Sequence, residues 1–98
     1  MTTPSTLALE SVWVRAEHVR AQRIKDEVVM ISETTNRYYA LDAVGTEIWT
    51  LLEHPISVAD LCATLQETFD VGSDRCLHDV SKLLEAMSRE ALVRVVGP

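Results

Sequence analysis

The side chains of this sequence that could do chemistry are two cysteines and three histidines: Cys62, Cys76, His18, His54 and His78. A cysteine beside a histidine can form a nucleophile and its base, and the two residue types together can bind a metal. The histidines fall in different expected elements, and no HExxH or CxxC spacing occurs. Cys76 and His78 are two positions apart, so on a helix their side chains diverge by about 200°. The spacing therefore predicts no catalytic group and no metal site.

The other candidates for chemistry have structural explanations. Cys62 and Cys76 lie inside amphipathic patterns, where a reduced cysteine behaves as a small apolar residue; a disulfide or a reactive thiol stays open as the alternative. Gly45, Gly72 and Gly97 are isolated, so neither a phosphate-binding loop nor a dinucleotide fingerprint is present. The carboxylates fall on the polar faces of the expected helices, where they serve solubility. We therefore expect no cofactor and no enzymatic activity.

Composition limits the size of the fold and the class of partner. The chain has 98 residues, enough for one domain, and 47% of them are hydrophobic. The net charge is −6, and the whole acidic excess lies in residues 42–98. Such a charge repels a phosphate backbone, and no segment resembles a secretory signal or reaches membrane-spanning length. The sequence predicts a cytoplasmic protein that binds neither nucleic acid nor a membrane.

Strands are expected in the first half of the chain. Residues 1–10 are small, polar and contain a proline, so we expect a flexible tail followed by a single domain over residues 11–98. Residues 11–24 begin with the alternation of a half-buried strand, although their later part is ambiguous. Residues 28–32 and 37–41 are short and rich in β-branched or aromatic side chains, and the polar residues between them suit a hairpin turn. Together these segments predict a three-stranded antiparallel sheet.

A helical period begins after Asp42. The first helix is expected to stop at His54-Pro55, because the residue before a proline resists the helical conformation. Ser57 then offers an N-cap hydroxyl to a second helix, and Asp60 can return a carboxylate to the start of that helix. The pattern thus indicates two consecutive helices separated by a proline.

The third expected helix is the longest. Gly72 is expected to end the second helix in a left-handed conformation, and Ser73 or Asp74 to cap the third. Apolar side chains at spacings of three and four define one stripe of this helix: Leu77, Val80, Leu83, Leu84, Met87 and Ala91. Residues 92–96 then form a closing strand. The fold class is α+β and winged helix-turn-helix-like, a three-stranded antiparallel sheet followed by three helices and a short C-terminal strand.

The segment from Val28 to Leu52 carries a more specific signal. An aromatic strand is followed by Leu41-Asp42, a short spacer to Gly45, and then Ile48-Trp49. This run resembles the signature of the PqqD-like family, the recognition elements of ribosomally made natural products, and the resemblance extends over about residues 11–96. The family more often has Asn at the position of Asp42, but Asp keeps a capping side chain there.

The resemblance implies a mode of binding in which the leader of a precursor peptide adds as a strand to the edge of residues 37–41, against the third helix. Backbone bonds at such an edge are not selective, so side-chain pockets must supply the specificity. Each lining residue could equally belong to the core. The residues expected to bind the peptide are Arg37, Tyr38, Tyr39, Ala40, Leu41, Cys76, Asp79, Val80, Leu83 and Met87.

The standalone members of this length resemble the small recognition proteins of lasso-peptide biosynthesis. The implied partners are therefore the precursor peptide leader, a separate leader peptidase of the cysteine-protease type, and the cyclase as a further candidate. The alternative is a winged-helix regulator or a general protein-interaction module. The third helix carries a net charge of −1 from Asp74 to Glu90, which argues against binding in a DNA groove.

Overall fold

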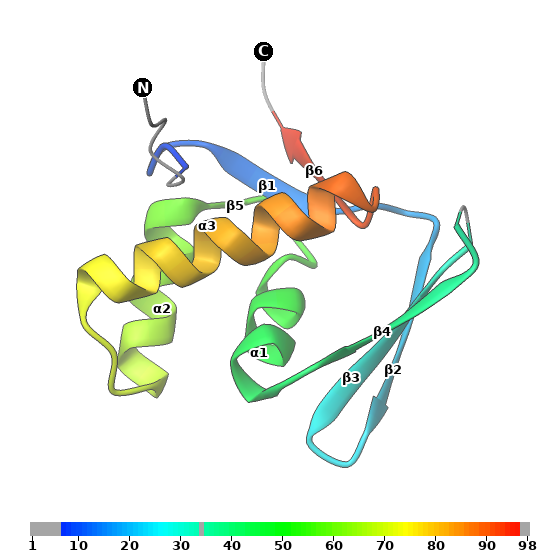
Figure 1. Ribbon diagram of the computed structural model, residues 1–98. Coiled ribbons are helices and arrows are strands. Elements are labelled where there is room, and N and C mark those ends of the chain that lie inside the picture. Colours follow the sequence, from blue (N-terminus) through cyan, green and yellow to red (C-terminus); the bar gives the residue numbers. More distant parts are fainter. Residues whose placement is uncertain (1–6, 34, 97–98) are drawn as a thin grey trace.

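The computed structural model describes residues 7–33 and 35–96, which form an α+β fold. Two small antiparallel sheets and three helices make up this part of the chain (Figure 1). The elements follow in the order β1 Val12–Arg15, β2 Val19–Ile24, β3 Glu27–Ser32, β4 Arg37–Leu41, α1 Ala43–Leu51, β5 Ile56–Ser57, α2 Val58–Thr68, α3 Ser73–Arg89 and β6 Val93–Val96.

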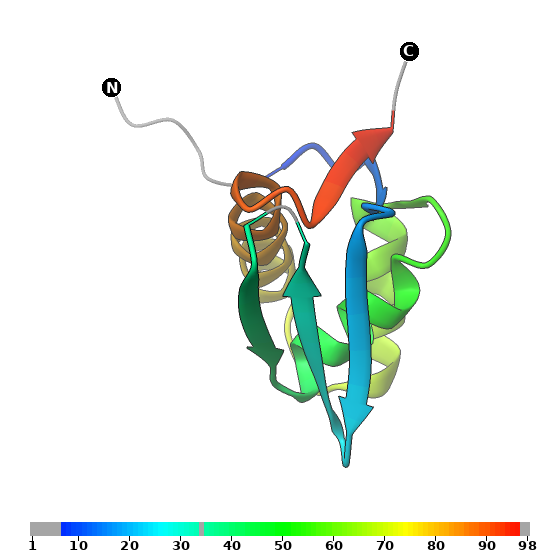
Figure 2. The same cartoon turned by 90° about the vertical axis from the view of Figure 1, so that its right-hand side faces the viewer.

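The first sheet has the strand order β2-β3-β4 and is the predicted three-stranded sheet. Its central strand alternates, with Val28, Met30 and Ser32 buried against the helices. The connection between β3 and β4 is a short turn in which Asn36 takes a left-handed φ of 57°, a conformation that Asn tolerates well. The helices lie on one side of this sheet, and none of the described elements covers the other side (Figure 2).

The second sheet corrects the interpretation of residues 11–24 as one strand. This segment contains two strands, because β1 pairs with β5 and β6 while β2 pairs with β3. Trp13 and Val14 are adjacent and both buried, so β1 does not show the one-sided burial that its alternation suggested. The chain therefore passes from one sheet to the other within a single apparent strand.

Helix α1 begins at a tightly built corner after β4. The Asp42 side chain accepts a hydrogen bond from the Gly45 N–H at 2.8 Å, as its predicted capping role requires. A Cβ on Gly45 would lie 3.2 Å from Leu41 Cβ, so the end of β4 and the first turn of α1 approach closely. The helix ends at Leu51, before His54-Pro55 as predicted.

The caps of the other two helices agree only in part with the sequence. Ser57 caps α2 through a bond from the Asp60 N–H at 3.1 Å, as predicted. Gly72 is the N-cap of α3 with a φ of −69°, so its expected left-handed conformation was wrong. Among the described residues no side chain caps α3, so the expected roles of Ser73 and Asp74 were also wrong. Ala91 lies beyond α3, is exposed and has a φ of 58°, so it does not extend the apolar stripe.

One core joins both sheets and the helices. Its fully buried apolar side chains come from β3, the three helices, and the residues just after α1 and just before β6: Met30, Ile48, Leu52, Val58, Leu61, Leu65, Val80, Leu84 and Leu92. Within the described part of the chain, no helix is long and apolar enough to cross a membrane. Of the expected tail, residues 1–6 lie outside the described residues, while the Leu7 N–H donates to Ser81 Oγ at 2.8 Å.

Candidate functional site

Strand β4 has one open edge, because β3 is its partner on the other side and no further described strand pairs with it. The orientation of its backbone follows from one bridge: the Val28 N–H donates to Thr46 Oγ1, which donates to the Leu41 carbonyl. Val28 and Leu41 are register partners, so their backbone groups point toward each other. Direction alternates along an antiparallel strand, so Tyr38 and Ala40 turn their N–H and C=O groups toward the open edge.

A groove runs between this edge and α3, and it consists of two adjoining hollows. The corner hollow, of about 370 Å³, is lined by Ala40, Leu41, Asp42, Val44, Gly45, Ile48, Asp79 and Leu83. The central hollow, of about 410 Å³, is lined by Met30, Tyr38, Tyr39, Ala40, Leu41, Leu83, Ala86, Met87, Glu90 and Leu92. Ala40, Leu41 and Leu83 belong to both linings, so the hollows form one continuous groove beside the free backbone groups.

The structure brings most of the predicted site residues to this groove. Tyr38, Tyr39, Ala40, Leu41, Asp79, Leu83 and Met87 line one hollow or both. Leu41 and Met87 are also buried, so they serve the core and the groove floor together. Tyr38 is 72% exposed, and its ring stands on the sheet face opposite the one that carries Tyr39.

Cys76 and Val80 lie apart from both hollows. They are buried and line a separate apolar space of about 60 Å³ beyond the corner hollow, together with Phe69 and Val71. Helical spacing placed them correctly on the flank of α3 that carries Leu83. The spacing could not show that the strand ends before it reaches them, because β4 stops at Leu41 and the chain turns into α1.

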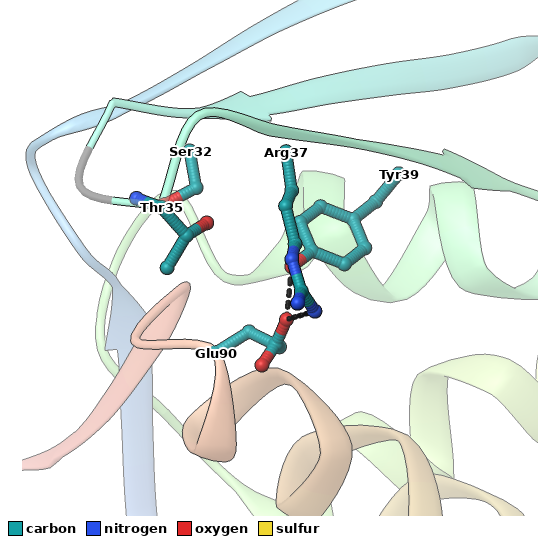
Figure 3. Close-up of polar contacts among 5 residues, drawn as sticks. All are labelled: Ser32, Thr35, Arg37, Tyr39 and Glu90. Carbon is teal, nitrogen blue, oxygen red and sulfur yellow. Dashed lines mark hydrogen bonds and ion pairs between the residues drawn. The ribbon is translucent and has the colours of Figure 1, made fainter.

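Arg37 reaches the groove through an ion pair rather than as a lining residue. Its Nη1 lies 3.2 Å from Glu90 Oε1, and the Tyr39 hydroxyl donates to the same oxygen (Figure 3). The bond from Tyr39, with the charge of Arg37, holds the pKa of the Glu90 carboxyl below its ordinary value. The three side chains therefore connect β4 to the C-terminal end of α3.

Eight residues that line the groove were not among the predicted site residues: Met30, Asp42, Val44, Gly45, Ile48, Ala86, Glu90 and Leu92. Glu90 follows Leu83 and Met87 at helical spacing, so the period of α3 could have predicted its place beside the groove. Ala86 lies beside Met87 on the same flank. Val44 carried no comparable signal, because its place in the groove depends on the angle at which α1 leaves β4.

The two thiols belong to the buried core. Cys62 and Cys76 are free and buried, as the amphipathic patterns predicted. Burial, and then the neighbouring Cys76 thiol, raises the pKa of Cys62 to about 12, and a thiol with such a pKa is a poor nucleophile. Among the described residues, no group of His, Cys, Asp and Glu side chains gathers closely enough to hold a metal ion.

Most of the chain matches the model of one known protein family. Residues 27–93 match the family model of coenzyme PQQ synthesis protein D, PqqD. This chain belongs to the PqqD family. The match runs from the start of β3 to the start of β6, so it includes every element that lines the groove. It confirms the resemblance read from the segment between Val28 and Leu52.

A solved structure with the same architecture is that of TbiB1 in complex with the TbiA(beta) leader peptide. The TM-score is 0.79 at 27% sequence identity, over 87% of this chain and 99% of the other. Comparison with the curated proteins found no match. The likeness to TbiB1 thus extends over most of this chain and nearly all of the other.

Proposed function

We propose that this protein binds the leader segment of a ribosomally synthesised precursor peptide, which adds as a strand to the open edge of β4. The observation that carries the proposal is the combination of free backbone groups on Tyr38 and Ala40 with an apolar groove directly beside them. The structural likeness to TbiB1, a protein solved with a leader peptide, supports the same conclusion.

The energetics require both parts of this site. Each backbone bond contributes about 0.5 to 1.5 kcal/mol net, so the groups of Tyr38 and Ala40 supply at most about 6 kcal/mol. A micromolar complex needs about 8 kcal/mol after the cost of association has been met. Burial of an apolar guest side chain adds roughly 1.5 to 3 kcal/mol. At least two guest side chains must therefore enter the groove, and these contacts select the peptide.

The other open edge of the same sheet is less suited to a guest. Strand β2 carries the exposed side chains of Arg20 and Arg23, and Lys25 follows it in the turn. Charged side chains on an edge strand discourage pairing with another chain. None of the described helices runs alongside β2 as α3 runs alongside β4 (Figures 1 and 2). The proposal therefore assigns the guest to β4.

The protein itself performs no catalysis in this proposal. It holds the leader in the cytoplasm and delivers the precursor to a separate leader peptidase of the cysteine-protease type, and from there to the cyclase, as in lasso-peptide biosynthesis. The buried, weakly acidic Cys62 thiol supports a role in binding rather than in chemistry. The resemblance to small standalone recognition proteins supports the pathway.

Peptide selection followed by mapping tests the proposal. A displayed library of random 20-residue peptides, together with the TbiA(beta) leader peptide, is presented to the protein, and binders are measured by calorimetry. We expect a binder whose addition perturbs the amide resonances of Tyr38 and Ala40. Leu83→Glu, which places a charge in the shared wall of the groove, should weaken binding at least tenfold.

Leu77→Glu provides the matched control. Leu77 is also a half-buried leucine of α3, but it faces the side of the helix that contacts α2. A folded Leu77→Glu variant should bind as the wild type does. The proposal is wrong if no peptide binds, if the bound peptide perturbs only residues away from β4, or if both glutamate variants bind equally well.

A further inference from the structure

Thr46 occupies an unusual position between the strands. It lies in the second turn of α1 and is 4% exposed. Its hydroxyl accepts a hydrogen bond from the Val28 N–H at 3.1 Å and donates one to the Leu41 carbonyl at 3.3 Å. Val28 and Leu41 are register partners at the end of the ladder, so the hydroxyl bonds to both members of this pair.

These contacts connect three elements. Through one hydroxyl, α1 is bonded to Val28 near the start of β3 and to Leu41 at the end of β4. The same residue belongs to α1, and its own N–H donates to the Asp42 carbonyl at 2.8 Å. Thr46 thus ties the end of β4 to the first turns of α1.

The walls of the corner hollow meet at this tie. Leu41 comes from the end of β4, Val44 and Ile48 come from α1, and Leu83 comes from α3. We infer that Thr46 is a positioning residue, whose buried hydroxyl sets the separation of the first two walls and so the shape of the subsite that takes an apolar side chain of the guest. This inference rests on the proposed function.

Thr50 offers a comparison on the same helix. Its hydroxyl donates to the Thr46 carbonyl at 2.9 Å, but its side chain is exposed and it contacts neither strand through that bond. Substitution of Thr50 by valine removes a hydroxyl from α1 without changing the bridge between Val28 and Leu41. Thr50→Val therefore separates a general effect on the helix from the specific effect of Thr46.

The experiment measures the affinity of the selected peptide for Thr46→Val, Thr46→Ser and Thr50→Val. Valine keeps the shape of threonine but cannot bond to Val28 or Leu41, so α1 loses its hydroxyl contacts with the ends of β3 and β4 that border the hollow. We expect about tenfold weaker binding for Thr46→Val, and wild-type binding for Thr46→Ser and Thr50→Val. Circular dichroism and urea unfolding verify that each variant is folded.

A second comparison distinguishes positioning from general destabilisation. Val44→Ala alters the corner hollow, whereas Tyr39→Phe alters the central hollow. The effect of Thr46→Val on affinity should be non-additive with Val44→Ala and additive with Tyr39→Phe. If Thr46→Val does not fold, the affinity of Thr46→Ser becomes the test, because the inference requires this variant to bind the peptide as the wild type does.

The outcomes separate the two proposals. Wild-type affinity in a folded Thr46→Val variant, or a loss in Thr46→Ser as large as in Thr46→Val, overturns the role of the hydroxyl and leaves the proposed function standing. Failure of the wild-type protein to bind any peptide at β4 overturns the proposed function, and the inference about Thr46 with it.

Discussion

Tyr39 and Glu90 form the polar contact that connects the open edge of β4 to α3. The bond from the Tyr39 hydroxyl is the largest influence that lowers the pKa of the Glu90 carboxyl, ahead of the charge of Arg37. We predict that Tyr39→Phe raises the pKa of Glu90 toward its ordinary value of 4.5. An NMR titration of the Glu90 side-chain carboxyl carbon measures this change.

The sign of the pH dependence follows from the direction of the shift. A carboxyl whose pKa is lower in the folded state stabilises the fold above its ordinary pKa, and this contribution is lost as the pH falls through the lower value of the folded protein. The wild type should therefore lose more stability on acidification below about pH 5 than Tyr39→Phe does. Tyr38→Phe is the control, because the Tyr38 hydroxyl makes no hydrogen bond to the described residues; an unchanged titration in Tyr39→Phe would contradict the assignment.

The cysteines give a second prediction for single residues. With the pKa of Cys62 at about 12, roughly one molecule in ten thousand carries its thiolate at pH 8. Cys62 and Cys76 are also buried. Iodoacetamide should label neither thiol of the native protein within the time in which it labels both in urea. Mass spectrometry counts the labels, and rapid labelling of the native protein would show that the helices open readily.

At the scale of elements, the sequence predicted what depends on local pattern. The hairpin of β3 and β4, the Asp42 and Ser57 caps and the flank of α3 follow from periodicity and turn chemistry. The division of residues 11–24 between two sheets does not, because each half pairs with a segment distant in sequence. The conformation of Gly72 was missed because α2 and α3 can be joined through an extended residue as well as through a left-handed one.

The same distinction applies to the candidate site. Spacing lists the residues on one strand or one helix flank, but the family resemblance selected this strand and this flank, and with them Tyr39 and Leu83. The positions of Val44 and Thr46 depend on the angle between β4 and α1, at the corner where the Thr46 hydroxyl contacts both strands. The angle between two elements cannot be predicted from the hydrophobic period of either element alone.

The orientation of the β4 backbone yields a prediction for this element. Ala40 turns its N–H toward the open edge, so Ala40→Pro removes a donor to the guest without breaking the ladder to β3. The variant should fold and bind the selected peptide about tenfold more weakly. Calorimetry measures the binding, and circular dichroism the fold.

Ala21 supplies the matched control for this substitution. It is an exposed alanine of β2, and by the same alternation its N–H faces the opposite open edge of the sheet. Ala21→Pro should fold and keep wild-type affinity. Equal losses in both variants would mean that the peptide does not add to β4, whereas an unfolded Ala40→Pro would mean that its N–H belongs to the ladder.

At the scale of the whole molecule, burial is unevenly distributed between the strands. Beyond Val19 every residue of β2 is exposed, whereas β3 contributes Met30 to the core. We predict that amide hydrogen exchange protects Met30 and Leu84 far more than Gln22, because β2 can separate without opening the core. Native-state exchange followed by NMR tests this, and equal protection of all three amides would show that the sheet opens only with the entire domain.

The pairing of β1 with β6 has a consequence for how the fold can be used. Val12 is the register partner of Val96, so the described fold starts and finishes at neighbouring points, on a sheet separate from the one that carries β4. A unit with adjacent ends can be inserted into a loop of a carrier protein or joined to an enzyme on either side. Strand β4 lies in the other sheet, so a fusion at β1 or β6 joins the carrier protein away from the strand that we propose to bind the peptide.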